Sequence, residues 1–364
     1  MPAAAIDSRI YRLSIAVLVG TLADLPERIP RGARSMTSMN RRAFARAMLA
    51  AGLAAAGIRA HAESSPSALR IGYQKSSTLI TLLKTRGTLE QALAPLGLRV
   101  SWHEFASGLP LTEALNVGAV DFSADVADTV PVFAQAAHAR FVYVAQEAPS
   151  PKAQAIIVKK DSALHTLGDL KGARIAVTKA AGSHYLLLAA LSRAKLAPSD
   201  AAVHYLTPAD GRAAFERGSV DAWITWDPYV ASVDRNADVR ILTDGSGLAS
   251  YQRYYLASTA FAAARPDVIQ ILFDRLSEAG TWLRDHPQDA AATLAPIWGL
   301  DATTIARANA RRSYLVRAVA AQNFGEQQKI ADAFLAAGLL PTRVDTGDAL
   351  RWDFAAKRAA PVRS

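Results

Sequence analysis

The sequence predicts an α/β protein of two similar lobes that face one cleft, and two internal repeats support this prediction. Ala114-Leu-Asn-Val-Gly-Ala-Val-Asp-Phe122 is echoed by Ala214-Phe-Glu-Arg-Gly-Ser-Val-Asp-Ala222. Upstream, Ile71-Gly-Tyr-Gln-Lys75 is echoed by Ile175-Ala-Val-Thr-Lys179. Repeats of this kind indicate duplicated structural units. Chance similarity between common strand–loop–helix units is the alternative, but both echoes keep their order and nearly their offset.

Strands and helices alternate through the predicted first lobe. Apolar spacing typical of a helix runs over 79–93 and ends at Pro95 and Gly97, because proline and glycine stop helices. Alternating residues indicate a strand at 98–105. The other predicted strands are 69–73, 120–123 and 141–145, and the other helices are 109–117 and 129–137.

Pro149 and Pro151 interrupt regular structure before the predicted second lobe. A polar turn and a short helix at 166–172 open that lobe. Strands alternating with helices imply a parallel sheet with helices on its faces. The predicted strands are 155–158, 175–177, 203–206 and 220–224, and the helices are 185–194 and 209–217. The pattern from 265 to 338 is almost entirely helical, with amphipathic spacing at 275–283 and 327–336. We expect these helices to cover the first lobe.

The positive charge of the chain is concentrated near its N-terminus. The 364 residues carry a formal net charge of +9. Residues 1–62 hold nine arginines and three acidic residues, a net of +6, whereas the remainder holds 32 basic and 29 acidic residues, a net of +3. The body has no Lys/Arg run and no basic aromatic motif, which argues against a nucleic-acid partner.

Residues 39–62 have the features of an export signal. Arg41 and Arg42 precede an apolar run over 47–58, and Ala60-His61-Ala62 matches the small-x-small site of signal peptidase. The arginine pair resembles a twin-arginine signal. A basic N-terminal membrane helix is the alternative, but the apolar run is shorter than the about 20 residues that span a bilayer.

The position of the export signal leaves residues 1–38 as an overextended reading frame, with Met36 or Met39 as the start, or as a long basic leader. The sequence contains no cysteine, which excludes disulfides and a cysteine-linked lipid anchor. Beyond the leader no segment has the length and apolarity of a transmembrane helix. We therefore expect a free, soluble periplasmic protein.

Six short motifs follow one another along residues 69–352: Ile71-Gly-Tyr-Gln-Lys, Ala114-Leu-Asn-Val-Gly, Phe133-Ala-Gln-Ala-Ala, Val177-Thr-Lys-Ala-Ala-Gly-Ser-His-Tyr, Val220-Asp-Ala-Trp-Ile-Thr-Trp-Asp-Pro and Arg253-Tyr-Tyr-Leu-Ala-Ser. Together they resemble the periplasmic substrate-binding proteins of ABC importers. The branch they resemble most is that of the aliphatic sulfonate-binding proteins, which is similar to the taurine and nitrate binders.

The resemblance implies a type II fold of two lobes that close like a hinge on a ligand. Lobe 1 would comprise 69–152 and 256–352, and lobe 2 would comprise 153–255, with crossovers near 149–153 and 251–258. It also implies a monomer that binds a small organosulfur anion for sulfur uptake, an inner-membrane ABC permease as partner, and no cofactor.

A sulfonate is a permanent anion with three acceptor oxygens, so its site needs hydrogen-bond donors and positive dipoles. Ser77-Thr78 and Gly182-Ser183-His184 each precede a predicted helix, whose N-terminus favours an anion. Gly182 would let the backbone approach the ligand closely. The alternative is that Ser77, Thr78 and Ser183 are only N-caps, which these residue types also favour.

Further candidates lie at strand ends, where ligands of open α/β sheets gather. Gln74 and Ser107 are placed there, with loop solvation as the alternative for Gln74. Trp226 could pack an alkyl tail or belong to the core. Asp227 could accept a ligand donor or cap the helix behind Pro228. The complete expected ligand set is Gln74, Ser76, Ser77, Thr78, Ser107, Gly108, Asp128, Thr129, Gly182, Ser183, His184, Trp226, Asp227 and Tyr255.

Three polar residues keep other interpretations open. Tyr255 could donate its hydroxyl to the ligand or be a buried sheet tyrosine. Many relatives carry a Thr-Gly element where this chain has Ser123-Ala-Asp-Val-Ala-Asp-Thr129. Asp125 and Asp128 would repel a sulfonate unless they cap a helix or meet a cationic substituent. They therefore keep a thiamine-precursor pyrimidine, as well as taurine or nitrate, as alternative ligands on the same fold.

The sequence argues against an enzyme. Ser183 and His184 are chain neighbours, which rarely form a nucleophile–base pair, and no G-x-S-x-G elbow surrounds the serine. The seven histidines show no metal-binding spacing, and there is no phosphate-binding loop. An exported hydrolase with a Ser–His pair is the rival from another class, and consumption of substrate would identify it.

Overall fold

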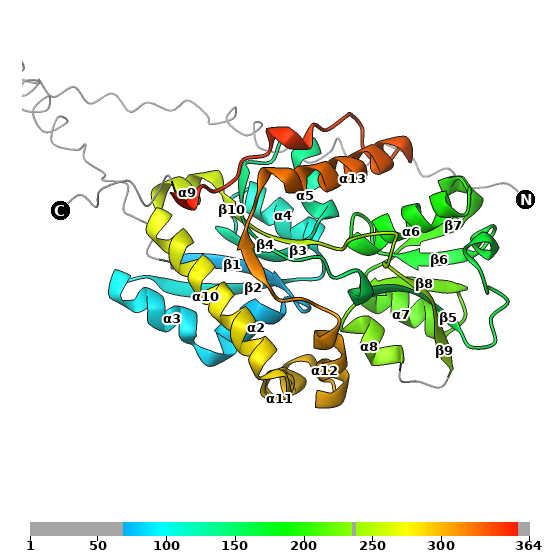
Figure 1. The fold of residues 1–364 in the computed structure, drawn as a ribbon, viewed down its shortest axis with the longest axis horizontal. Coiled ribbons are helices and arrows are strands. Elements are labelled where there is room, and N and C mark those ends of the chain that lie inside the picture. Colours follow the sequence, from blue (N-terminus) through cyan, green and yellow to red (C-terminus); the bar gives the residue numbers. More distant parts are fainter. Residues whose placement is uncertain (1–67, 235–237, 356–364) are drawn as a thin grey trace, which may run out of the picture. The chain divides into compact units, whose positions relative to one another are not determined.

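The protein is described by a computed structural model that covers residues 68–234 and 238–355. The predicted export signal at 39–62 and residues 1–38 lie outside the described residues. The model contains two β-sheets flanked by helices (Figure 1), which confirms the α/β class. No helix within the described ranges has the length and apolarity that crossing a membrane requires.

The first sheet has six strands in the order β11-β4-β10-β3-β1-β2. Its strands are β1 (Ala68–Gln74), β2 (Arg99–Phe105), β3 (Phe122–Ala127), β4 (Phe141–Glu147), β10 (Arg253–Ser258) and β11 (Val316–Ala318). β1 pairs with β2 and β3 in parallel, whereas β10 runs antiparallel to β3 and β4. The expected parallel pairing therefore holds for β1, β2 and β3, whereas β10 pairs antiparallel because the chain re-enters this sheet from the opposite direction.

The second sheet has five strands in the order β7-β6-β8-β5-β9. They are β5 (Gln154–Lys159), β6 (Arg174–Val177), β7 (Ala202–Tyr205), β8 (Ala222–Trp226) and β9 (Val239–Asp244). β6 is parallel to β7 and β8, and β5 is antiparallel to β8 and β9. Of these strands, β9 is not predicted from the sequence. We call each sheet with the helices packed on it a lobe.

Helices cover both faces of the first sheet. One face meets α2 (Thr78–Arg86), α3 (Thr88–Leu93), α9 (Thr259–Ala264), α10 (Pro266–Asp285), α11 (Pro287–Trp298) and α12 (Ala302–Ala310), and the other meets α4 (Gly108–Asn116) and α5 (Thr129–Ala136). Figure 1 shows α2, α3 and the yellow α10 on the same side of the sheet. The single helix predicted over 79–93 is two helices, because Gly87 adopts φ +64° and ends α2.

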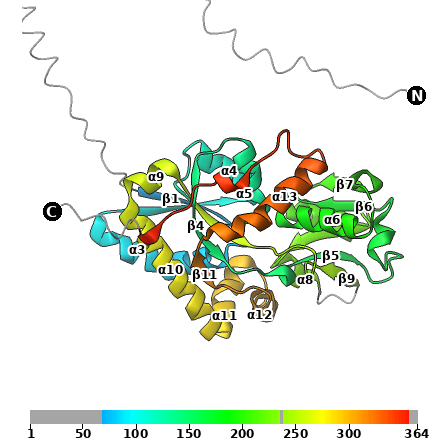
Figure 2. The same ribbon diagram turned by 45° about the horizontal axis from the view of Figure 1, so that its top comes forward.

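The second sheet also lies between helices. α6 (Gly182–Arg193) packs on one face against Ile175 and Val177, and α7 (Pro208–Glu216) and α8 (Tyr229–Asp234) pack on the other around Trp223. α13 (Phe324–Ala336) contacts α5 of the first lobe and α6 of the second (Figure 2). This helix therefore touches both lobes.

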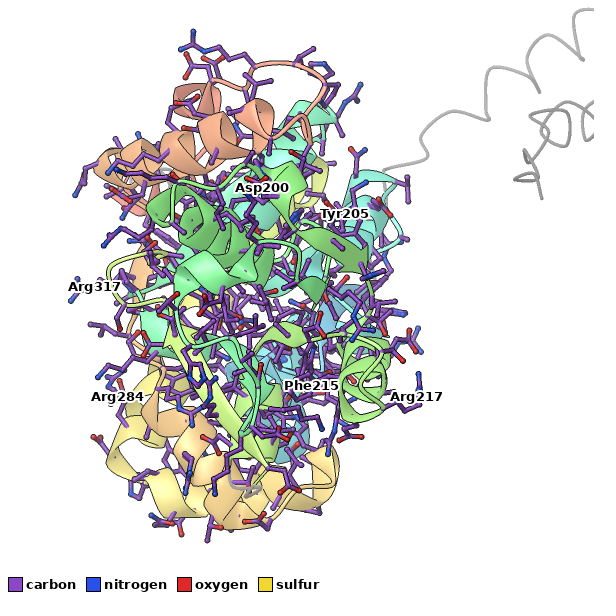
Figure 3. The ribbon with its side chains drawn as sticks, turned by 90° about the vertical axis from the view of Figure 1, so that its right-hand side faces the viewer. Asp200, Tyr205, Phe215, Arg217, Arg284 and Arg317 are labelled. Carbon is purple, nitrogen blue, oxygen red and sulfur yellow. The ribbon has the colours of Figure 1, made fainter. Side chains whose placement is uncertain are left out.

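The sequence repeat has a structural cause that is the same in both lobes. Asp121 accepts hydrogen bonds from the backbone N, Nε and Nη2 of Arg70 at 2.9, 3.0 and 2.6 Å. Asp221 accepts the same three bonds from Arg174 at 2.8, 3.1 and 2.7 Å. In each lobe this pair ties the start of one strand (β1 or β6) to the turn that enters its parallel neighbour in the sheet (β3 or β8). Arg217, in the second copy of the repeat, extends outward from the lobe (Figure 3).

Two crossover segments connect the lobes. The first runs from β4 to β5 through the turn Pro151–Ala153, and the second runs from β9 to β10. They hydrogen-bond to each other, since Ser150 N donates to Ser250 O and Gly245 N donates to Pro151 O, both at 3.0 Å. The segment 251–258, predicted as a crossover, is mostly the central strand β10. Its residues are almost all buried, as in a strand covered on both faces.

Removal of the repeat carboxylate is expected to cost more stability in the first lobe than in the second. The Asp121 side chain is 8% exposed, whereas that of Asp221 is 36% exposed. Asp121→Ala removes the acceptor shared by the backbone N–H and the half-exposed guanidinium of Arg70, and should lower the unfolding free energy by about 1–2 kcal/mol. Asp221→Ala, the matched control, should cost less because water replaces its bonds. Equal losses in chemical denaturation would contradict this prediction.

Candidate functional site

A small cavity lies where the two lobes meet. The first lobe contributes the ends of β1 and β3 and the starts of β10, α4 and α5, and the second lobe contributes the start of α6 and the end of β8. Tyr251 of the second crossover completes the wall. The lining residues are Gln74, Gly108, Ala127, Val130, Ala181, Gly182, Trp226, Tyr251 and Arg253.

Three helices begin at this cavity. Gly108 is the first residue of α4, Val130 lies in the first turn of α5, and Gly182 is the first residue of α6. The first N–H groups of a helix have no partner within the helix, and they carry the positive end of its dipole. The cavity is therefore surrounded by donors from both lobes that favour an anion.

Arg253 adds a cation to the cavity wall. Its side chain is 2% exposed, and its Nε lies 2.5 Å from Oδ2 of Asp125. Nη1 donates to the hydroxyl of Tyr251 at 2.8 Å, and Nη2 donates to the carbonyl of Asp125 at 3.0 Å. Burial, the largest single influence, would lower the pKa of Arg253, but the charges of Asp125, Tyr251 and Glu147 together outweigh it, so the pKa is raised. The guanidinium therefore stays charged.

Arg312 lies behind the cavity wall and is equally buried. Its Nη2 bonds Oδ2 of Asp125 at 2.9 Å and both oxygens of Glu147 at 3.0 and 2.8 Å. Its Nη1 donates to Ser76 O at 3.0 Å and to Thr78 Oγ1 at 3.2 Å. Arg312 thus fixes the β1–α2 loop. Asp125, which sequence reasoning treats as a helix cap or a partner for a cation, is an ion-pair partner within the protein.

The corresponding loop of the second lobe, between β6 and α6, is held through the backbone groups of Ala180. Ala180 adopts φ +61°, a conformation that is uncommon for residues other than glycine. Its N–H donates to Nδ1 of His184 at 3.2 Å, and its carbonyl accepts from Thr129 Oγ1 of the first lobe at 2.6 Å. Ser183 is fully buried, and its hydroxyl has no hydrogen-bond partner.

Four of the predicted ligand residues line the cavity: Gln74, Gly108, Gly182 and Trp226. Ser76 is adjacent, since its hydroxyl accepts from Nε1 of Trp226 at 3.2 Å across the lobes. Asp128 lies behind the cavity, where Oδ2 accepts from Gln252 N at 2.9 Å and fastens the second crossover. Burial raises the pKa of Asp128 to about 6.

The N-cap alternative is not what the structure shows. Ser77 occupies the N-cap position of α2 but makes no capping bond, because its hydroxyl accepts from Gln74 N at 3.1 Å instead. Thr78 bonds Tyr314 at 3.0 Å. Ser107 precedes α4 without a capping bond, and Ser183 lies inside α6, whose N-cap is an alanine.

Three predicted residues have structural contacts away from the cavity. The hydroxyl of Tyr255 donates to Glu147 at 2.7 Å. Tyr255 is therefore a buried tyrosine of the sheet, the alternative to a ligand-binding role. Asp227 caps the following helix, accepting from Ala231 N at 2.9 Å. His184 packs against rings of both lobes and is only 1% exposed. Burial and the nearby Lys179 lower its pKa to about 4.

Sequence reasoning missed the arginines of the site. Arg253 lies within a motif that carries the family resemblance, and Arg312 lies at the end of a helical pattern. Neither position has a sequence signal for burial, because an arginine next to apolar residues is ordinarily at the surface. Only the acids Asp125 and Glu147 on other strands make burial of these charges tolerable.

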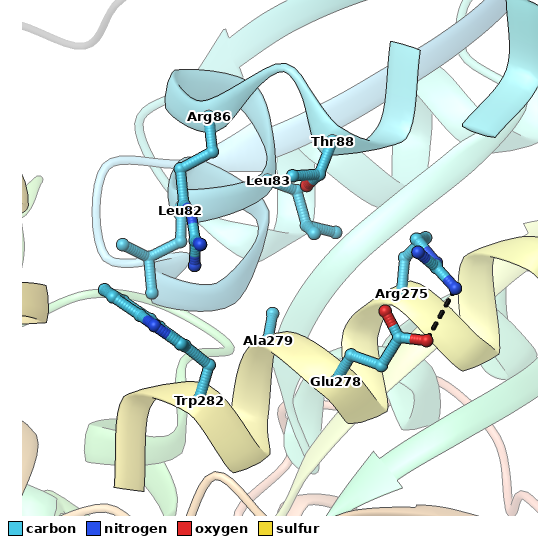
Figure 4. A pocket seen from close by; sticks show the side chains of 8 residues that line it. All are labelled: Leu82, Leu83, Arg86, Thr88, Arg275, Glu278, Ala279 and Trp282. Atoms are coloured by element: carbon cyan, nitrogen blue, oxygen red, sulfur yellow. Dashed lines mark hydrogen bonds and ion pairs between the residues drawn. The ribbon is translucent and has the colours of Figure 1, made fainter. Parts of the chain in front are cut away.

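A second hollow, of about 570 Å³, lies between α2 and α10 (Figure 4). Its two arginines already have partners: Arg86 stacks on Trp282 at 4.1 Å, and Arg275 bonds Glu278 at 2.5 Å. It therefore lacks the free donors of the cavity between the lobes. No cluster of metal-binding side chains occurs in the described part of the chain.

Comparison with known proteins gives consistent matches. Residues 94–290 match the family described as NMT1/THI5 like. The chain is 42% identical over 285 residues to a protein of Escherichia coli (strain K12) named as an aliphatic sulfonates-binding protein. The matched region covers 78% of this chain and 88% of that protein.

Solved structures agree. The alkanesulfonate-binding protein SsuA from Xanthomonas axonopodis pv. citri, bound to MOPS, matches with a TM-score of 0.75 and 39% identity, over 79% of this chain and 99% of that one. SsuA from Escherichia coli matches with a TM-score of 0.72 and 41% identity, over 79% and 98%. The predicted two-lobed periplasmic binding protein fold is confirmed. The desulfurization enzyme DSZB shares the fold at 15% identity and a TM-score of 0.58, over 77% and 95%.

His184 is expected to make folding less favourable in acid. Its pKa falls from 6.5 in the unfolded chain to about 4 in the folded protein. Between pH 7 and pH 5 the histidine therefore becomes protonated in the unfolded chain but stays mostly neutral in the folded protein. This difference lowers the unfolding free energy by about 2 kcal/mol. Asp128 and Asp227, with pKa values raised by burial to about 6 and about 7, act in the opposite direction. Denaturation of wild type and His184→Gln at both pH values isolates the histidine, and identical pH dependence would contradict the prediction.

Proposed function

Because this chain belongs to the NMT1/THI5-like family and, within it, to the aliphatic sulfonate-binding proteins, we propose that it is the solute-binding component of an ABC importer. It binds an aliphatic sulfonate reversibly between its two lobes and delivers it to a permease for sulfur uptake. The observation that carries this proposal is the cavity itself, at which three helix N-termini and the charged side chain of Arg253 converge.

The sulfonate head group matches what this cavity offers. Its three oxygens accept hydrogen bonds and have no proton to donate, so they suit helix N–H groups and a guanidinium. The hydroxyl of Ser183 is buried without a partner, and a buried donor without a bond is costly. We propose that Ser183, Gly182, Gln74 and Arg253 hold the head group, and that Trp226 packs against the alkyl part.

The acidic residues do not favour a cationic ligand. Oδ2 of Asp125 already meets Arg253 and Arg312, and Asp128 is engaged with Gln252 and Ser250. A pyrimidine precursor or the ammonium of taurine would have to compete with these bonds. A thermal-shift screen of alkanesulfonates, taurine, sulfate, nitrate and thiamine precursors tests the ligand class, since a ligand at about 100 times its dissociation constant adds about 2.7 kcal/mol of stability.

We propose that the protein is not an enzyme. Nδ1 of His184 accepts from Ala180 N, and Nε2 faces the hydroxyl of Tyr205 at 3.5 Å. Ser183 has no hydrogen-bond partner, so the two residues do not form a nucleophile–base pair. Loss of substrate over time would overturn this assignment.

Export through a twin-arginine signal is the proposal for residues 39–62. Arg41→Lys with Arg42→Lys keeps the charge but removes the arginine pair, so delivery to the periplasm should fall strongly, and mature protein should otherwise begin near Glu63. Cell fractionation and N-terminal sequencing measure both. Unchanged periplasmic yield would contradict the twin-arginine assignment, and an uncleaved N-terminus would contradict the signal itself.

Ser183→Ala is expected to weaken sulfonate binding about 10- to 150-fold. The change removes a hydroxyl donor to a charged acceptor, and such bonds are worth about 1.5–3 kcal/mol. Thr225→Val is the matched control, because Thr225 also has a buried hydroxyl without a partner but lies within strand β8 rather than in the first turn of a helix. Calorimetry with ethanesulfonate should show wild-type affinity for the control. Equal affinity in both variants would place the head group elsewhere.

A further inference from the structure

Arg311, in the first lobe, forms ion pairs with two aspartates of the second lobe. It follows α12, and its Nη1 donates to Oδ1 and Oδ2 of Asp227 at 3.1 and 3.3 Å, while Nη2 bonds Oδ2 of Asp234. The three side chains are 16%, 2% and 11% exposed. Ion pairs this far removed from water are screened less by salt than surface pairs, so salt weakens this contact between lobes less than it weakens a surface bridge.

The two carboxylates lie at the ends of α8, which contacts α12 and lies beside it in Figures 1 and 2. Asp227 is bonded through its backbone N to Ala153 O of the first crossover at 2.8 Å. The preceding residue, Trp226, lines the cavity. Arg311 therefore holds the wall of the cavity that belongs to the second lobe.

The next residue, Arg312, holds the opposite wall. Its bonds to Ser76 O and Thr78 Oγ1 fix the β1–α2 loop of the first lobe, whose Ser76 hydroxyl in turn meets Trp226. Two consecutive arginines at the end of one helix thus bond the two sides of the cleft, one each. Neither Arg311 nor Arg312 lines the cavity.

We propose that Arg311 sets ligand affinity without touching the ligand, by stabilising the arrangement in which the lobes meet. This inference rests on the proposed binding function. The apparent dissociation constant equals the intrinsic constant divided by the fraction of molecules in the binding arrangement. The pairs of Arg311 with Asp227 and Asp234 exist only when the lobes are together, so they raise that fraction before any ligand arrives.

Arg311 has the geometry for this role and its neighbour Arg307 does not. A planar guanidinium that meets two carboxylates gives directional, charge-assisted bonds. Arg307 also reaches Asp234, at 3.3 Å, but its side chain is 48% exposed. We therefore expect the effect of Arg307→Ala to be small, and the coupling to be specific to Arg311 and Asp234.

Lobe separation tests the proposal directly and needs no ligand. The sequence has no cysteine, so Glu113→Cys in α4 and Arg217→Cys beside α7 place one exposed label on each lobe. Arg311→Ala and Asp234→Ala should each shift the population of inter-label distances measured by single-molecule energy transfer, and the double variant should add little to either. Arg212→Ala, which breaks the pair with Glu216 and a bond to Ser232 that both lie within the second lobe, should leave the distances unchanged.

Affinity is the second readout. With ethanesulfonate as probe, Arg311→Ala and Asp234→Ala should bind about 10-fold more weakly, Arg311→Lys should lie between, and Arg212→Ala should match wild type. Unchanged distances in both variants would overturn the proposal, as would altered distances with unchanged affinity. Failure of the wild type to bind any sulfonate would instead overturn the proposed function, because the separation measurement is made without ligand.

Discussion

The contact between Arg312 and Asp125 is the constraint on which the rest of the site depends. It joins the segment after α12 to strand β3, and through the same guanidinium it reaches Glu147 and the β1–α2 loop. Asp125 also receives Arg253, so two buried cations share two buried anions. Taking such charges out of water is costly unless each has partners of good geometry. Loss of one member would leave the others uncompensated, which makes the cluster an all-or-none support for the cavity.

Charge balance within this cluster affects what the cavity can bind. The two arginines are offset by Asp125 and Glu147, so attraction for an anion comes from the orientation of donors rather than from net charge. Fixed helix N-termini and a guanidinium held by Asp125 and Tyr251 need little reorganisation when an anion arrives. Such a cavity suits a ligand with one delocalised negative charge.

The sequence predicts the fold where its signal is local and fails where the signal is distant. The repeat around Asp121 and Asp221 is readable because each lobe pairs this aspartate with an arginine at the start of the neighbouring parallel strand. Glycines and serines after strands likewise locate Gly108 and Gly182. In contrast, β10 resembles an extended crossover until its pairing with β3 and β4 is known. Burial of Arg253 and Arg312 depends on acids far along the chain, which no local pattern reveals.

Several contacts between the lobes, and not the ligand alone, stabilise the arrangement in which the lobes are together. Trp226 meets Ser76, Thr129 meets Ala180, and α13 bridges α5 and α6. Each contact forms only between lobes, so each contributes to the equilibrium between separated and joined arrangements. A ligand can shift that equilibrium only by its differential affinity for the two arrangements. If the protein's own contacts between lobes are strong, closing the lobes takes up less of the ligand's binding free energy. The same contacts also make it harder for the lobes to separate and release the ligand. Transport therefore limits how strong these contacts can become.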